Sequence, residues 1–128
     1  MTLAIVPLYA AVLAALYFIL SVRAIGARRL GRKAIGPIGE AALDRRLRVH
    51  ANFAEYVPFV LLLLAFAEIR GVPSGALHFA GAVLVAGRLA HAWGVSQPME
   101  NFRFRVAGMS GTFTALWSAV AAIVASYF

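Results

Sequence analysis

Hydrophobic residues run in long stretches along this chain, almost without interruption. Thr2–Val22 and Val106–Phe128 contain no Asp, Glu, Lys, Arg or His, and Val49–Ile69 and Pro73–Gly94 contain only a few polar side chains. Each stretch is long enough to cross a hydrocarbon core of roughly 30 Å as a helix. Runs such as Leu61–Leu64 lack the period-2 alternation of membrane barrel strands. We therefore predict an all-α membrane protein with four transmembrane helices.

The composition supports a single membrane domain covering residues 1–128. The chain is 62% hydrophobic and 13% charged, whereas soluble domains are roughly 45–50% apolar and 25% charged. A soluble chain of this length buries only about two-thirds of its surface and could not hide so much apolar area. Because cysteine is absent, there is no disulfide and no thiolate metal ligand, and we expect no metal site.

Most of the positive charge lies in the first and third predicted loops. A net charge of +7 would by itself suit nucleic acid or a membrane surface. Val95–Arg105 carries Arg103 and Arg105, whereas the second loop has only Arg70. The first loop contains Arg23, Arg28, Arg29, Arg32, Lys33, Arg45, Arg46 and Arg48. The positive-inside rule places both basic loops in the cytoplasm and both termini outside, so we expect lipid head groups, and no nucleic acid, as partners.

The middle of the first loop is rich in residues that interrupt helices. These residues are Gly26, Gly31, Gly36, Pro37 and Gly39. Such a segment is typically irregular and mobile. Glu40–Arg48 regains a helical composition, so we expect it to extend the second predicted helix into the cytoplasm. Gly81, Gly87, Gly108 and Gly111 lie inside predicted spans, where small residues commonly allow close helix packing.

Polar side chains on the second predicted helix share one narrow face. At 100° per residue, Arg48, Asn52 and Glu55 fall within about 60° of one another, with Arg45 beside them. Ionisable groups at membrane depth cost roughly 2.5–3.5 kcal/mol each on insertion scales. Helix packing alone would need only one polar partner and not four polar side chains on one face, so this stripe indicates a ligand site. His50 falls on the opposite face, where we expect a packing role.

The third predicted helix brings further polar groups to the same level. Arg88 and His91 share a face because they are three residues apart. Glu55 and Arg88 each lie roughly 9 Å inside the cytoplasmic end of their span, so antiparallel packing allows them to form an ion pair. That pair could be purely structural. Arg23 and Arg105 border the same layer, whereas His78 is expected at the opposite membrane interface.

An arginine-rich pocket open to the cytoplasm suits an anionic molecule with several carboxylates. Arginine binds carboxylates through two parallel hydrogen bonds, and a glutamate can hold an ammonium group. Glutathione offers two carboxylates, an amine and a thiol. A nearby arginine would favour the thiolate, which is the reactive form.

The residues of this pocket resemble the MAPEG family, the membrane-associated proteins in eicosanoid and glutathione metabolism. Its members include microsomal glutathione transferases and leukotriene and prostaglandin synthases. Arg48–Glu55 (RVHANFAE), followed by Pro58, is similar to the family signature R-x-H-x-N-x-x-E…P. Gly87–His91 and Arg105–Met109 support the likeness, which covers almost the whole chain and looks closest to short bacterial members.

The resemblance implies a homotrimer of four-helix subunits in the bacterial inner membrane, with glutathione bound between neighbouring subunits near the cytoplasmic face. The implied glutathione contacts are Arg23, Arg48, Asn52, Glu55, Arg88 and His91. The implied thiol-activating residue is Arg105, with Arg103 as the alternative because the loop length leaves the alignment loose. Val95 stands where characterised synthases carry a tyrosine, and Tyr127 is at the wrong end of the fourth predicted helix to replace the family tyrosines there.

Three functions compete on this basis. The first is an enzyme of the glutathione S-transferase or peroxidase type, acting on hydrophobic electrophiles that enter from the bilayer. The second is a non-catalytic binding or adaptor protein with the same pocket. The third is a small four-helix multidrug exporter, which is disfavoured because such transporters carry their key acidic residue in the first helix and Thr2–Val22 has none.

Overall fold

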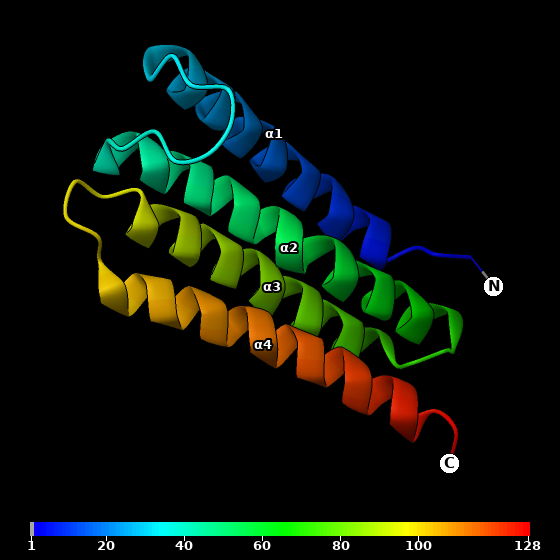
Figure 1. Cartoon of the computed structure of the whole chain (residues 1–128). Helices are drawn as coiled ribbons and strands as arrows, with labels where there is room; N and C mark the ends of the chain where they lie inside the picture. Colours follow the sequence, from blue (N-terminus) through cyan, green and yellow to red (C-terminus); the bar gives the residue numbers. More distant parts are fainter. Residues whose placement is uncertain (1) are drawn as a thin grey trace.

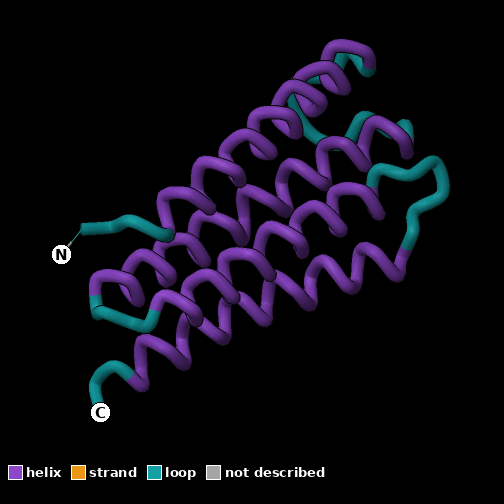
Figure 2. Tube along the Cα trace, turned by 180° about the vertical axis from the view of Figure 1, so that it is seen from behind, coloured by secondary structure: helices purple, strands orange, loops and turns teal. Residues whose placement is uncertain are grey.

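Four antiparallel helices make up the computed structural model, which describes residues 2–128. They are α1 (Val6–Leu30), α2 (Ala41–Ile69), α3 (Ser74–Val95) and α4 (Phe102–Ala125). Both termini and the α2–α3 loop lie at one end of the bundle, and the α1–α2 and α3–α4 loops lie at the other, as Figures 1 and 2 show from opposite sides. The prediction of an all-helical chain with four helices is confirmed.

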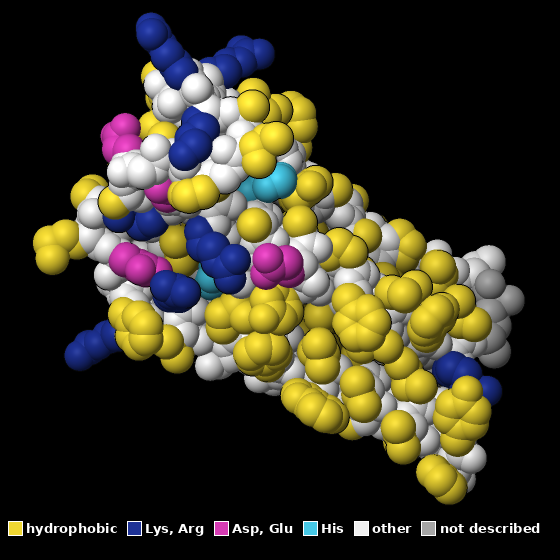
Figure 3. All heavy atoms as spheres, in the orientation of Figure 1, with side chains coloured by type: hydrophobic (Ala, Val, Ile, Leu, Met, Phe, Trp, Pro, Cys, Tyr) yellow, Lys and Arg dark blue, Asp and Glu magenta, His cyan; other side chains and the backbone are white. Residues whose placement is uncertain are grey.

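Three of these helices, α1, α2 and α4, are long and apolar enough to cross a membrane. The remaining helix, α3, is less clearly transmembrane, because the polar side chains of His78, Arg88 and His91 lower its hydropathy. Hydrophobic side chains cover most of the length of the bundle, and charged side chains gather at the end that holds the α1–α2 and α3–α4 loops (Figure 3). This distribution matches a bundle surrounded by lipid along its flank.

The helix α1 is longer than the hydrophobic pattern indicated. The prediction that the first loop begins at Arg23 was wrong, because α1 continues to Leu30. Arg28 and Arg29 lie in its last turn, where positive charge interacts favourably with the helix dipole. The helix stops only at Gly31. The expected extension of the second helix is confirmed, since α2 begins at Ala41.

Side chains hold the α1–α2 loop in place. The Arg28 guanidinium donates to the backbone carbonyls of Lys33 and Gly36. The Asp44 carboxylate accepts the backbone N–H groups of Ile38 at 2.7 Å and Gly39 at 2.9 Å. The irregular backbone includes positive φ angles at Gly36 and Gly39, of 77° and 92°, a region that glycine adopts without strain.

Polar contacts also tie the helices together at the end that holds the termini. The Glu68 carboxylate of α2 accepts the backbone N–H groups of Ala4, Ile5 and Val6 at 2.7, 2.7 and 2.8 Å. Val6 is the first residue of α1, and Ala4 and Ile5 come directly before it. N–H groups at the start of a helix have no acceptor within the helix, and the positive end of the helix dipole there favours a carboxylate. The start of α1 is thereby fixed to the end of α2.

The closest helix packing is between α3 and α4. A Cβ atom added at Gly108 would lie 2.5 Å from the backbone nitrogen of His91 and 2.6 Å from the carbonyl oxygen of Gly87. A Cβ atom at Gly87 would lie 2.9 Å from the carbonyl oxygen of Gly108. The two backbones can approach this closely only because both positions are glycine, as the sequence predicted for these residues.

Replacing Gly108 with Ala is expected to destabilise the protein, because the new methyl group would collide with backbone atoms of α3. Overpacking of this kind typically costs about 1–3 kcal/mol. Thermal unfolding in detergent, followed by circular dichroism, measures the effect. The matched control is Gly26→Ala in α1, where no atom lies within 4 Å of the added carbon. Equal losses of melting temperature in both variants would contradict the close approach of α3 and α4.

Candidate functional site

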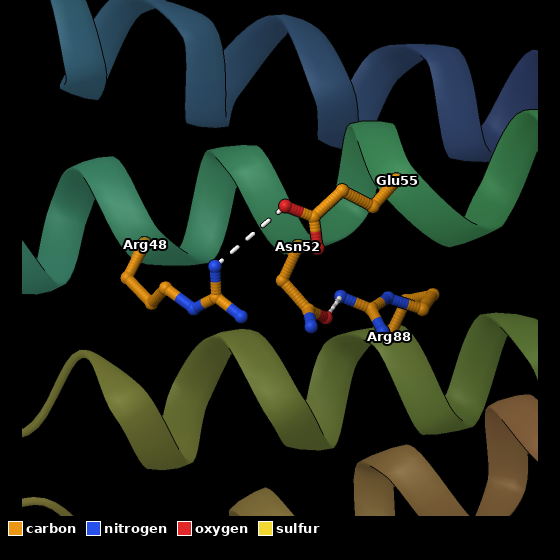
Figure 4. A network of polar contacts seen from close by, with 4 residues as sticks. All are labelled: Arg48, Asn52, Glu55 and Arg88. Atoms are coloured by element: carbon orange, nitrogen blue, oxygen red, sulfur yellow. Dashed lines mark hydrogen bonds and ion pairs between the residues drawn. The ribbon is translucent and has the colours of Figure 1, made fainter.

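The polar stripe on α2 divides into an exposed part and a buried part (Figure 4). Arg48 and Glu55 form an ion pair on the outside, with 3.6 Å between Nη1 and Oε1 and with 56% and 52% of their side chains exposed. Asn52, between them along the helix, is only 6% exposed and points toward α3. Arg45 points elsewhere and donates to the carbonyl oxygen of Pro98 at 3.0 Å.

Arg88 is the centre of the buried part. Its side chain is 1% exposed, and its guanidinium reaches two neighbouring helices. Nη2 donates to Asn52 Oδ1 of α2 at 2.7 Å. Nη1 donates to Thr112 Oγ1 of α4 at 3.2 Å and lies 3.6 Å from Met109 Sδ. The guanidinium therefore connects α2, α3 and α4.

No carboxylate pairs with Arg88 among residues 2–128, and its Nε has no hydrogen-bond partner there. The expected ion pair between Glu55 and Arg88 was wrong. The two residues do lie on facing helices, but Arg88 points into the interior of the bundle, where its guanidinium reaches Asn52 of α2. Glu55 lies at the outer edge of the stripe and pairs with Arg48, which is two turns away on the same helix face.

His91 is held in the same interior cluster. It is 2% exposed, and its Nδ1 lies 3.3 Å from Nη2 of Arg88. A guanidinium can only donate hydrogen bonds, so Nδ1 must be the acceptor and the neutral ring carries its proton on Nε2. The structure thus brings three of the sequence-predicted site residues, Asn52, Arg88 and His91, into one hydrogen-bonded cluster.

Three arginines converge on the α3–α4 loop at the charged end of the bundle. Arg23 of α1 donates from Nη1 to Ser96 Oγ at 3.2 Å, and Arg45 of α2 holds Pro98. Arg105, in the first turn of α4, forms a 2.7 Å ion pair with Glu100. The alternative thiol-activating residue, Arg103, is exposed.

The other two histidines lie outside this cluster. The ring of His50 stacks on Tyr17 with 5.1 Å between centroids, a contact that fits its expected packing role. His78 shares a 2.8 Å hydrogen bond with the Tyr9 hydroxyl, near the end of the bundle that holds the termini. Neither contact involves the arginines.

Several partners of the site arginines were missed from the sequence. Thr112 and Met109 contact the buried guanidinium of Arg88. Glu100 pairs with Arg105, and Ser96 accepts a hydrogen bond from Arg23. Thr112 also donates to the Gly108 carbonyl at 2.9 Å. Thr112 could have been found by counting residues along α4 from the end at the α3–α4 loop to the expected depth of Arg88.

The buried hydrogen bond of Asn52 is expected to matter more for stability than the ion pair of Glu55. Asn52→Leu keeps a similar volume but removes an acceptor from a buried cation, which costs about 1.5–3 kcal/mol. Glu55→Gln disturbs only a pair that is more than half exposed, and such pairs are worth about 0–1 kcal/mol. Unfolding of both variants in detergent measures the difference. A larger loss for Glu55→Gln would make Glu55 the compensating group of Arg88.

Comparison with known proteins agrees with this arrangement. The chain is 38% identical over 109 residues to the Inner membrane protein YecN of Escherichia coli (strain K12), covering 85% of this chain and 82% of the relative. The protein of the same name from Escherichia coli O6:H1 matches to the same extent. The model of the MAPEG family matches residues 6–125, a range that runs from the first residue of α1 to the last residue of α4. The resemblance seen in the sequence is confirmed, and the chain belongs to the MAPEG family of membrane proteins.

Proposed function

We propose that this protein is a glutathione-dependent transferase or peroxidase that acts on hydrophobic electrophiles from the bilayer. The observation that carries the proposal is the polar group on α2 and α3, in which Arg48 and Glu55 are exposed and Asn52 accepts from buried Arg88, beside His91 (Figure 4). A cluster of cations with one accessible carboxylate is complementary to a small peptide that carries two carboxylates and one amine. Family membership supports glutathione as that peptide.

The exposed pair on α2 fits the amino-acid end of such a ligand. Arg48 and Glu55 present opposite charges 3.6 Å apart, so a carboxylate can bind the guanidinium while the neighbouring ammonium binds Glu55. Both side chains are accessible, and an exposed pair costs little to rearrange. Arg88 and His91 lie behind Asn52 and hold its amide in place, which we propose is their main contribution to binding.

Arg105 is proposed to stabilise the thiolate. A cation near a thiol favours its ionised form, and the thiol proton leaves to solvent at the charged end of the bundle. The thiolate sulfur then attacks the electrophilic carbon, and the leaving group departs with the bonding electron pair. With a lipid hydroperoxide, the thiolate sulfur attacks the terminal oxygen and the O–O bond breaks. The lipid alkoxide leaves and takes up a proton, and the sulfenic acid formed on glutathione condenses with a second glutathione to give the disulfide and water.

An apolar groove offers an approach for such substrates. It lies between α1 and α2, has a volume of about 260 Å³ and is lined by apolar and aromatic side chains that include Leu13, Tyr17, Phe53 and Val57. A hydrophobic molecule can move from lipid into this groove without entering water. This supports an electrophile supplied by the bilayer.

We further propose a homotrimer in the bacterial inner membrane, with both termini outside the cytoplasm. The E. coli relative is an inner membrane protein. The family resemblance implies the trimer, with glutathione between subunits. A partner subunit would also cover Arg48 and Glu55, which are more than half exposed on the flank of the single subunit.

A second candidate is a non-catalytic binding protein with the same site. Two observations favour it: Val95 stands where characterised synthases of the family carry a tyrosine, and Arg105 is already paired with Glu100. Such a protein would bind glutathione without increasing its thiolate fraction.

Arg105→Ala is expected to lower the amount of bound thiolate by about tenfold or more, because a nearby cation favours the thiolate to that extent. Near-ultraviolet difference spectra with saturating glutathione measure it. Arg103→Ala tests the alternative alignment, and Arg29→Ala removes the same charge elsewhere in the chain as a control. If no variant differs from the wild type, neither arginine activates the thiol and the binding-protein candidate is favoured.

Single-cysteine labelling is expected to place the α1–α2 loop in the cytoplasm. The chain has no cysteine of its own. Ile35, which is 84% exposed in that loop, and Tyr127, which is 68% exposed at the other end, are each replaced by Cys. An impermeant maleimide added to intact cells should label Tyr127→Cys and not Ile35→Cys. The opposite pattern would invert the orientation.

A further inference from the structure

The Arg105–Glu100 ion pair lies at the proposed thiol-activating residue. Glu100 Oε1 is 2.7 Å from Arg105 Nη1, and 31% and 40% of the two side chains are exposed. Glu100 belongs to the short α3–α4 loop, which Arg23 and Arg45 also hold. Within residues 2–128, only two ion pairs are formed, and each one places a carboxylate of the chain on an arginine of the proposed site.

The backbone around Glu100 leaves little freedom for its position. The N–H of the next residue, Asn101, donates to the Gly94 carbonyl at 2.9 Å, and its side chain caps the start of α4 by accepting from the N–H of Phe104. A Cβ atom at Gly94 would lie 2.9 Å from the backbone nitrogen of Arg105. The end of α3 and the start of α4 are therefore packed closely, and Glu100 is presented to Arg105 at a high effective concentration.

We propose that Glu100 is a specificity-determining residue of this site, an internal carboxylate that occupies Arg105 until an anionic ligand displaces it. A ligand with one weak contact cannot compete with an intramolecular partner. A ligand that also binds Arg48 and Glu55 can displace Glu100 from Arg105, because the partly exposed Glu100–Arg105 pair is weak. The site thereby selects molecules with several charged groups. This inference rests on the proposed function, since it assumes that Arg105 faces the ligand.

The chain offers a matched control for the removal of this charge. Glu40 lies at the same end of the bundle, is exposed, and makes no capping hydrogen bond with its side chain. Glu40→Gln and Glu100→Gln change the net charge equally, so they share any long-range electrostatic effect. Only Glu100→Gln removes a direct partner of Arg105.

The first measurement needs no ligand. Phenylglyoxal is an uncharged reagent that modifies accessible arginines, and peptide mass spectrometry of the detergent-purified protein gives the rate at Arg105, with exposed Arg103 as the internal reference. We expect Glu100→Gln to increase the rate at Arg105 by about two- to fivefold, the range that an exposed ion pair supports. Glu40→Gln should leave it unchanged. Equal rates in all three proteins would overturn the inference.

The second measurement adds glutathione and separates the two proposals. Protection of Arg105 from phenylglyoxal should need about two- to fivefold less glutathione in Glu100→Gln than in the wild type. Faster modification without protection at any concentration would support the displaceable pair and overturn glutathione as the ligand. Protection that needs more glutathione in Glu100→Gln would show that Glu100 orients Arg105 for binding, which contradicts the inference.

Discussion

The fold of this protein depends on one buried cation, Arg88, whose hydrogen-bond partners are neutral side chains. Taking a guanidinium out of water is costly unless its hydrogen bonds are replaced. Here Asn52, His91 and Thr112 replace most of them. These partners come from three helices, so the rotation and the spacing of α2, α3 and α4 must all be correct for Arg88 to remain buried. Gly108 is part of the same requirement, because α4 brings Thr112 within reach only where the α3 and α4 backbones nearly touch.

The position of Arg88 decides what the rest of the α2 stripe can do. Because Asn52 turns inward to accept from Arg88, its neighbours on the stripe remain outside. Among residues 2–128, Arg48 and Glu55 then form an ion pair only with each other, and an exposed pair of this kind is weak. One helix face thus supplies both an inner polar contact that stabilises the bundle and an outer pair that is available for binding.

The hydrophobic pattern was sufficient to predict the helices, because each apolar stretch is longer than a bilayer requires and ends in charged or turn-forming residues. It could not predict that α1 continues through Arg28 and Arg29, since basic residues suit both a cytoplasmic loop and a last helical turn. The helical wheel placed Arg48, Asn52 and Glu55 on one face. Which edge of that face is buried depends on the rotation of α3 about its axis, which the packing of Gly87 on Gly108 sets. The equal depth of Glu55 and Arg88 in the membrane therefore predicted the wrong partner for Arg88, which contacts Asn52.

The same packing explains why the charged end of the bundle suits an anion. The Asp44 carboxylate is occupied by backbone N–H groups, and Glu55 and Glu100 each face one arginine. These acidic groups neutralise only part of the surrounding positive charge, because most of the lysines and arginines lie at this end. The remaining field attracts any anion, as it would attract lipid head groups. Selection among anions must then come from short-range geometry. In the binding mode that we propose, that geometry consists of two carboxylates that a ligand has to replace, at positions fixed by α2 and by the α3–α4 loop.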